Sequence, residues 1–189
     1  KVDGSVACWG YNGYGVLGNG TTTSSSTPVA VSGLTDAVAV TAGDNHSCAL
    51  RAGGSVSCWG FNANGQLGDN STSDRSTPVG VAGLGNVATL ATSFRHNCAV
   101  KTDGTVVCWG NNVNGQLGDG SYTARTTPVP VSGLGSVAGI TTGYQHSCAL
   151  KTDGAVVCWG GNGYGQLGNG SSTGSAAPVD VSGGAVFWK

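Results

Sequence analysis

The sequence contains no methionine, few charged residues and no long hydrophobic run. Because none of the 189 residues is Met, we expect the chain to be a processed product or a segment of a longer protein. No stretch approaches the roughly 18 consecutive apolar residues of a membrane-spanning helix. Charged side chains make up 9% of the residues and the formal net charge is -1. The chain therefore lacks the clustered positive charge with which proteins bind nucleic acids.

A recognisable catalytic constellation is also missing. Asp and Glu together number 9, and no Ser/His/Asp or Cys/His group stands apart from the repeating pattern described below. A catalytic site usually departs from the local pattern at one place, whereas here the same pattern recurs throughout. We therefore predict a protein that is not an enzyme and that needs no cofactor or metal.

Repetition is the most informative feature that is present. The tripeptide Cys-Trp-Gly recurs with a constant step of 50 residues, beginning at Cys8, Cys58, Cys108 and Cys158. Three other motifs keep this step: Gly-x-Leu-Gly from Gly15, Gly65, Gly115 and Gly165, Pro-Val from Pro28, Pro78, Pro128 and Pro178, and His-x-Cys from His46, His96 and His146. A strict period of this length is typical of solenoids, arrays and propellers, in which each repeat buries its apolar surface against the next.

One repeat predicts four short strands. Four segments of the third repeat are separated by turn-rich sequence and lack helical periodicity: residues 87–93, 96–101, 105–110 and 128–131. The stretch 111–125 is rich in Gly and Asn, which suit positive φ angles. Pro128 fits a strand at the edge of a sheet. The predicted fold class is all-β: a β-propeller of four-stranded antiparallel blades, with about three and a half to four 50-residue repeats and an incomplete ring.

All the blades are expected to form one propeller domain. From the N-terminus we predict a partial blade that holds only the third and fourth strands, then three complete blades, then a tail or the start of a further blade. The predicted boundaries are 1–36, 37–86, 87–136, 137–182 and 183–189. The third strand of the partial blade, near residues 6–10, would lack its natural neighbour. Because exposed edges invite pairing, we expect residues 1–10 to contact the tail 181–189 or another polypeptide, and favour the latter.

The connection between the second and third strands predicts a register. If Cys98 lies opposite Cys108, a three-residue loop ending in Gly104 remains. Such loops usually end in a residue with left-handed backbone geometry, which glycine adopts without strain. Directly opposed residues of an antiparallel pair have Cα atoms about 4.5 Å apart at the non-hydrogen-bonded positions, a distance that a disulfide can bridge.

Three disulfides are therefore predicted, each within one hairpin: Cys48–Cys58, Cys98–Cys108 and Cys148–Cys158. The alternative is three pairs of buried free thiols that pack as small hydrophobic groups, as in a cytosolic protein. A zinc site is disfavoured, because two Cys and one His per repeat give too few ligands for a closed tetrahedral site. Cys8 has no predicted partner in the chain, so we expect it to be unpaired or to form an intermolecular bridge.

The repeated Trp and His residues are interpreted as structural: Trp9, Trp59, Trp109 and Trp159, and His46, His96 and His146. Each Trp follows a Cys on an extended strand, so it points to the opposite face, where a neighbouring blade would bury it. Histidines on successive blades would lie roughly 10 Å apart, too far to share a metal ion. We expect them to make structural hydrogen bonds, with a channel-lining functional role as the alternative. The loops 69–71 and 119–121 superficially resemble calcium-binding sequences but offer few carboxylates.

The motifs resemble a known family. Residues 146–160, His-Ser-Cys-Ala-Leu-Lys-Thr-Asp-Gly-Ala-Val-Val-Cys-Trp-Gly, together with Gly-Gln-Leu-Gly and Pro-Val-x-Val, are similar to the regulator of chromosome condensation repeat. The likeness is greatest to its cysteine-bearing branch in bacterial secreted and cell-surface proteins. It covers nearly the whole chain and implies a propeller of four-stranded blades, of which the founding member has seven.

The resemblance does not imply one function. The founding member's exchange activity on a small nuclear GTPase and its chromatin binding depend on loops and a basic tail that have no match here. A bacterial secreted inhibitor of β-lactamases has a similar fold and acts by binding protein. That example implies that the scaffold can act by binding a protein, without catalysis.

These observations predict a non-catalytic extracellular module of a secreted or cell-surface protein that binds protein or glycan. One alternative is a structural subunit whose open blade edges assemble into a larger ring or filament, and another is an inhibitor that acts by binding an enzyme. The predicted partners are a protein or further copies of the chain, with a glycan as a further option, and neither nucleic acid nor a membrane span. The extracellular or cell-surface localisation rests on the predicted disulfides.

Overall fold

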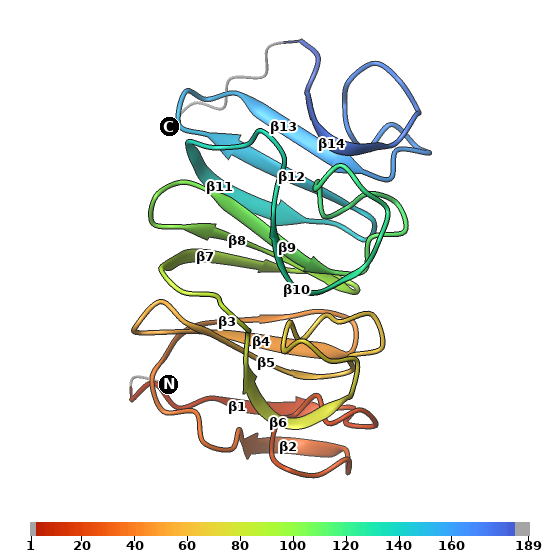
Figure 1. Cartoon of the computed structure of the whole chain (residues 1–189). Helices are drawn as coiled ribbons and strands as arrows, with labels where there is room; N and C mark the ends of the chain where they lie inside the picture. Colours follow the sequence, from red (N-terminus) through yellow and green to blue (C-terminus); the bar gives the residue numbers. More distant parts are fainter. Residues whose placement is uncertain (1–2, 184–189) are drawn as a thin grey trace.

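The computed structural model describes residues 3–183, and within them the chain forms strands, turns and loops without a helix. Figure 1 labels the strands. Their bounds are β1 Ala7–Gly10, β2 Ser25–Ala30, β3 Ala37–Ala42, β4 His46–Arg51, β5 Val56–Gly60, β6 Arg75–Gly80, β7 Val87–Thr92, β8 His96–Lys101, β9 Val106–Gly110, β10 Arg125–Pro130, β11 Val137–Thr142, β12 His146–Lys151, β13 Val156–Gly160 and β14 Ser175–Asp180. The predicted all-β class is confirmed.

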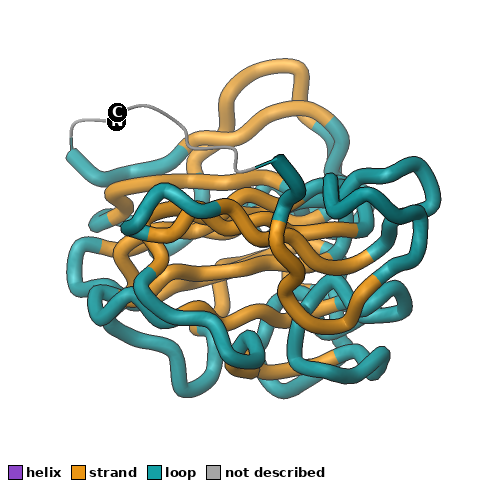
Figure 2. The backbone as a smooth tube through the Cα atoms, turned by 90° about the horizontal axis from the view of Figure 1, so that it is seen from above, coloured by secondary structure: helices purple, strands orange, loops and turns teal. Residues whose placement is uncertain are grey.

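The strands form one two-stranded sheet, β1–β2, and three four-stranded antiparallel sheets, β3–β6, β7–β10 and β11–β14. Figure 1 shows the four sheets following one another in a single row, each as one blade. Seen from above in Figure 2, the strands run through the middle of the molecule and the loops lie at their ends. Within the described residues no sheet joins strands from both ends of the row, so the ring is open, as predicted.

The predicted register between the second and third strands is confirmed. Cys98 pairs with Cys108 across β8 and β9. The amide N–H of Lys101 donates to the carbonyl of Thr105 at 2.8 Å and closes the loop. Gly104 has a φ of 77°, the left-handed geometry that the loop length required. Turn chemistry and strand pairing within one hairpin were therefore sufficient to determine this part of the blade.

The fourth strand differs from its predicted range 128–131. β10 begins at Arg125, which pairs with Gly110, and a bulge separates that pair from the pairing of Val129 with Cys108. The early start is tied to the preceding blade, because the amide of Asn70 donates to the carbonyl of Thr126 at 3.0 Å. A contact between residues 56 positions apart leaves no mark in the local sequence pattern. The strand does lie at the edge of its sheet, where a proline is tolerated.

The core lies between the sheets rather than within them. The cysteine-bearing face of one blade packs against the tryptophan of the next: Trp109 joins a buried cluster with Cys48 and Cys58, and Trp159 does the same one blade further. Gly68, with a φ of 69°, ends the Gly-Gln-Leu-Gly motif under the Trp109 ring. A Cβ at Gly68 would lie 2.9 Å from the indole nitrogen, so only glycine allows this approach.

Candidate functional site

The predicted cysteine pairs lie at disulfide distance. Their Sγ atoms are 2.11 Å apart in Cys48–Cys58 and Cys98–Cys108 and 2.13 Å apart in Cys148–Cys158. All seven cysteines fall in the described part of the chain, and Cys8 is the one without a disulfide partner. Its side chain is half-buried, and this burial raises the pKa of the thiol. Cys8 therefore differs from the other six in both bonding and environment.

The tryptophans of the repeat occupy two environments. Trp59, Trp109 and Trp159 are 0% exposed. Their indole N–H groups donate to main-chain carbonyls of the preceding blade, at 2.8 Å to Val16, 3.0 Å to Gln66 and 2.9 Å to Gln116. Trp9 is 63% exposed, so its predicted burial is wrong. The reason is geometric, because burial requires a preceding blade and the described residues contain none before β1.

The histidines link neighbouring blades. His96 is fully buried, and its Nε2 lies 2.9 Å from the hydroxyl of Ser147 in the next blade. Ser147 gives its only hydroxyl proton to the carbonyl of Gln116, so Nε2 of His96 must be the donor. The hydroxyl of Ser93 donates to Nδ1 of the same ring. Both ring nitrogens thus have a hydrogen-bond partner when the imidazole is neutral. Burial lowers the pKa of His96 to about 3.

The burial and hydrogen bonding of the other two histidines depend on whether a further blade follows. Nε2 of His46 lies 3.0 Å from Oδ1 of Asn97, and burial lowers the pKa of His46 to about 4. His46 Nδ1 has no hydrogen-bond partner within residues 3–183. His146 belongs to the last described blade and is less buried, and its pKa is also lowered by desolvation. A structural role suits His46 and His96 more than a metal site.

A second set of buried polar residues was missed by the sequence reasoning. Asn12, Asn62, Asn112 and Asn162 are almost completely buried at the base of the long loop of each blade. In the third blade Oδ1 of Asn112 accepts from the amide of Leu117, while Nδ2 donates to the carbonyls of Ser121 and Thr123. One side chain thus ties three points of the loop together. The signal was an Asn four residues after every Cys of Cys-Trp-Gly, but the Gly- and Asn-rich composition of the loop indicated only positive φ angles.

In the loops 69–71 and 119–121, the carboxylates bind other groups of the protein. Burial would raise the pKa of Asp69, but hydrogen bonds from Ser71 and Arg75 outweigh it and hold that pKa below its usual value. Asp119 makes the corresponding ion pair with Arg125 at 2.7 Å. Among the residues that the structure describes, no group of three or more His, Cys, Asp or Glu side chains could hold a metal ion. The two carboxylates therefore stabilise their own loops.

The repeat is broken along one line of aromatic side chains, here called the aromatic ridge: Tyr11, Tyr14, Phe61, Phe94, Arg95 and Tyr144. Ring centroids are 6.2 Å apart for Tyr11 and Tyr14 and 4.9 Å apart for Tyr14 and Phe61. The guanidinium of Arg95 then lies 5.5 Å above Phe61 and 4.7 Å above Phe94. The centroid of Tyr144 is 4.2 Å from that of Phe94. The ridge therefore runs across all four blades.

The ridge borders a small cavity between the third and fourth blades. The cavity has a volume of about 190 Å³ and is lined by Phe94, Arg95, Asn111 and Tyr144 among others. Tyr144 is 58% exposed, whereas Nε of Arg95 is buried and has no hydrogen-bond partner within residues 3–183. Sequence reasoning missed this feature because it considered only the residues that recur with the constant step of 50 positions. The signal lay in the positions that do not keep it: Asp44, Phe94 and Tyr144 are equivalent but chemically different.

These blades are built from one repeating unit, and that unit defines a class of β-propeller. The family model of the regulator of chromosome condensation (RCC1) repeat matches residues 3–50, 53–100, 103–150 and 153–186. A second model of the same repeat matches residues 37–66, 87–116 and 137–166. The chain belongs to the RCC1 repeat family.

Solved structures agree with this assignment. Human WBSCR16 is 30% identical over 95% of this chain, which corresponds to 48% of WBSCR16, with a TM-score of 0.83. Yeast RCC1 (Prp20) bound to Kap60 is 22% identical over 95% of this chain and 45% of its own, with a TM-score of 0.80. The Saccharomyces cerevisiae Prp20p structure is similar at 22% identity, 95% and 46% coverage and a TM-score of 0.81. The chain spans about half the length of these proteins, and no curated protein sequence matches it.

Proposed function

We propose that the chain is a non-catalytic protein-binding propeller module of a secreted or cell-surface protein, and that the aromatic ridge is its contact surface. The observation that carries the proposal is the continuous contact of Tyr11, Tyr14, Phe61, Arg95, Phe94 and Tyr144 across four blades. Aromatic residues and arginine are the types most enriched in the energetically dominant part of protein interfaces.

The size of the neighbouring cavity favours a protein over an enclosed small molecule. Small-molecule sites usually have volumes of about 300–1,000 Å³, and the cavity beside Arg95 has about 190 Å³. A shallow hollow beside stacked rings suits a protruding side chain of a partner. The Arg95 guanidinium, which lines the hollow and is partly exposed, would pair with a carboxylate of that partner. A similar propeller, yeast RCC1, is seen bound to the protein Kap60, which agrees with this proposal.

The cysteine pairs support the cellular setting. Three pairs at disulfide distance within one small chain suit an oxidising compartment. Among residues 3–183 there is no helix of the length and hydropathy that a membrane span requires. The three cysteine pairs are thus the observation that supports a setting outside the cell or at its surface.

A matched pair of variants tests the ridge. The chain would be immobilised and exposed to secreted proteins from its own source and, separately, to a glycan array. We expect a protein ligand whose binding is lost in the double variant Arg95→Ala with Tyr144→Ala. Tyr164→Ala removes a ring that is 96% exposed and outside the ridge, so it should leave binding unchanged. Equal binding by both variants would refute the ridge as the contact surface. Binding that depends on the ridge but occurs only on the glycan array would show that the ligand is a carbohydrate and not a protein.

A second function, assembly of copies, is favoured by the two ends of the row. The last blade carries an open apolar cavity of about 460 Å³ lined by Ile140, Cys148, Leu150 and neighbouring residues. The equivalent face of the third blade is covered by Trp159, and at the other end of the row Trp9 is exposed. Light scattering should show multimers that dissociate in Leu150→Asp but persist in Val113→Asp, a change at a residue outside this face. A monomer at all concentrations would exclude this function.

A further inference from the structure

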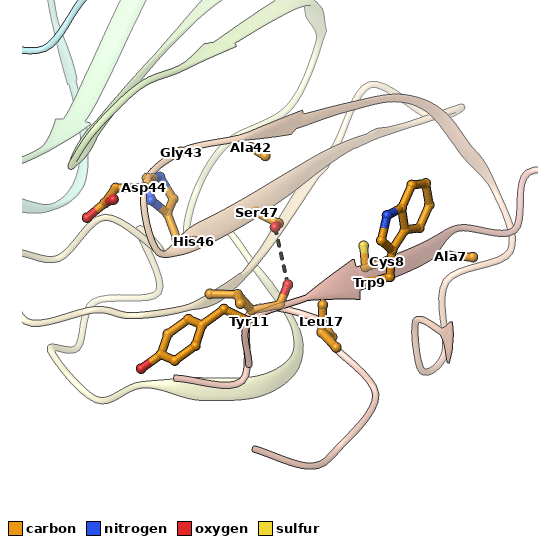
Figure 3. A pocket seen from close by; sticks show the side chains of 11 residues that line it. Ala7, Cys8, Trp9, Tyr11, Leu17, Ala42, Gly43, Asp44, His46 and Ser47 are labelled. Atoms are coloured by element: carbon orange, nitrogen blue, oxygen red, sulfur yellow. Dashed lines mark hydrogen bonds between the residues drawn. The ribbon is translucent and has the colours of Figure 1, made fainter. Parts of the chain in front are cut away.

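The interfaces between neighbouring blades differ in chemistry beside the aromatic ridge. Two equivalent positions, one from each blade, carry a different pair of residues at each of the three interfaces: Tyr11 and Asp44, Phe61 and Phe94, and Asn111 and Tyr144. Figure 3 shows Tyr11 and Asp44 among the residues that line a cavity at the first interface. The first interface thus has a carboxylate here, the second has two rings, and the third has an amide beside a ring.

Arg95 fills the second interface. Its guanidinium lies 5.5 Å from the ring centroid of Phe61. Three polar atoms are buried there without a hydrogen-bond partner within residues 3–183: Nε of Arg95, Oδ1 of Asn64 and Nε2 of Gln66. The equivalent residues of the third interface line the hollow of about 190 Å³ between the third and fourth blades: Gln145, Asn114 and Gln116. The hollow is therefore the open counterpart of a site that an arginine fills one blade earlier.

Arg95 also borders the hollow, and it is the only charged residue among the described ones that line it. Within residues 3–183 every other Lys and Arg forms an ion pair with an Asp of the chain: Arg51, Arg75, Lys101, Arg125 and Lys151. Arg95 has no ion pair there and instead lies between two rings, 4.7 Å from the centroid of Phe94 on one side. Its Nε is buried, so the two terminal nitrogens are the atoms that a ligand can reach.

A second donor is held beside Arg95. Oδ1 of Asn111 accepts from Nε2 of Gln116 at 2.7 Å and from the amide of Val113 at 3.3 Å. These bonds orient the side-chain amide and leave its NH2 group to donate. The main-chain amide of Asn111 donates to the carbonyl of Arg95 at 2.9 Å, so the two side chains start from adjoining points. The hollow therefore offers a guanidinium and an amide donor side by side.

We propose that the hollow is a specificity pocket for one acidic side chain of a protein partner. The carboxylate binds the terminal nitrogens of Arg95 and the NH2 group of Asn111. Val113 and Tyr144 also line the hollow and are 66% and 58% exposed, so they offer apolar surface to a residue that neighbours the Asp or Glu. This pocket rests on the proposed function, because it borders the aromatic ridge, and it specifies which kind of residue the partner must present.

The surroundings of Arg95 favour a charged ligand over a neutral one. Hydrogen bonds between ionised groups are roughly twice as strong as those between neutral groups. Arg95 also loses little freedom on binding, because Phe61 and Phe94 already hold its guanidinium. At the first interface Asp44 stands where the third has Tyr144, and its charge would repel an acidic side chain. The preference is therefore expected at the third interface and not at the first.

Two peptides of the same size test the charge preference: acetyl-Val-Glu-Val-amide and acetyl-Val-Gln-Val-amide. Each would be titrated into the whole chain labelled with ¹⁵N, and NMR would follow the side-chain N–H signals. The Glu peptide should shift the signals of Arg95 Nε–H and of the Asn111 NH2 group, and should bind at least about tenfold more tightly than the Gln peptide. The signals of Arg51 and Arg125, which are ion-paired elsewhere, are internal controls and should not move.

Variants with little change in shape test the two donors. Asn111→Asp keeps an oxygen for Gln116 but replaces the NH2 group by a carboxylate oxygen, so the Glu peptide should bind about tenfold more weakly. Arg95→Gln should remove the preference for the Glu peptide over the Gln peptide. Lys101→Gln is the matched control, because it removes one positive charge outside the hollow and should leave the preference unchanged. Circular dichroism would show that each variant is folded.

The proposal is overturned if the two peptides bind equally, if neither binds at millimolar concentration, or if the shifted signals exclude Arg95 and Asn111. Tighter binding of the corresponding phosphoserine peptide would replace the acidic side chain by a phosphorylated one. A protein partner that needs the ridge but binds equally well after its contacting Asp and Glu residues are changed to amides would sustain the proposed function and remove the pocket. Selective binding of the Glu peptide without any protein partner would sustain the pocket and remove the proposed function.

Discussion

Trp109 on β9 donates its indole N–H to the carbonyl of Gln66, 3.0 Å away in the loop of the preceding blade. The side-chain amide of Asn97 donates to the same oxygen at 2.7 Å. The next interface repeats this arrangement around Gln116. In the first three Gly-x-Leu-Gly loops, one carbonyl thus receives two donors from the following blade. The blades are joined by this repeated contact in addition to apolar packing.

The two tryptophan environments predict opposite mutational effects. Trp109→Ala should lower the free energy of unfolding by about 3–5 kcal/mol, because it leaves a cavity and removes one of the two donors to the Gln66 carbonyl. Trp9→Ala should change it by less than about 0.5 kcal/mol, since most of that ring is exposed. Urea denaturation followed by circular dichroism would measure both. Equal losses would mean that Trp9 is covered in solution.

Three disulfides predict a mass change on reduction. Reduction should add about 6 Da, two hydrogens for each opened bridge. Replacing Cys98 and Cys108 together by Ser should cost about 3 kcal/mol of unfolding free energy, given the short loop that the bridge closes. Cys8→Ser should cost much less. Seven thiols that react with an alkylating agent before reduction would contradict both the disulfides and the extracellular assignment.

Buried histidines predict a loss of stability in mild acid. The pKa of His96 is about 3 in the folded chain, below the ordinary value of 6.5, so the unfolded chain binds its proton first as the pH falls. Stability is therefore complete above about pH 6.5 and declines toward pH 3. The free energy of unfolding should fall between about pH 7 and pH 5, and His96→Gln should make this fall smaller by about 2 kcal/mol. His146→Gln should remove less, because His146 is less buried. An unchanged pH profile in His96→Gln would refute the assignment.

The loop asparagines predict a fourth effect on stability. Asn112→Ala should cost about 2–4 kcal/mol, because the amide of Leu117 and two loop carbonyls lose their partner. Asn114→Ala is the matched control in the same loop, since its side chain is less buried, and should cost less than about 1 kcal/mol. Chemical denaturation of the two variants side by side would test this. Similar costs would show that the loop does not depend on the buried amide.

Features that depend on short sequence distances were predictable. The pairing of Cys98 with Cys108 and the left-handed Gly104 follow from the length of one hairpin loop. The repetition of the motifs identified the propeller class, because a unit that cannot bury its apolar face alone must stack on a copy of itself. Among the four tryptophans the sequence made no distinction, and this is where the prediction for Trp9 failed.

The sequence by itself therefore determined the four-stranded blade, the register of its central hairpin and the family to which it belongs. The tertiary structure decided which copies of a repeated residue are buried, since that depends on whether a neighbouring blade lies against them. It also brought Phe61, Arg95 and Tyr144 into one ridge, although they come from three different repeats. Local chemistry acts over a few residues along the chain, whereas contacts between blades join residues about one repeat apart and form only when the blades stack.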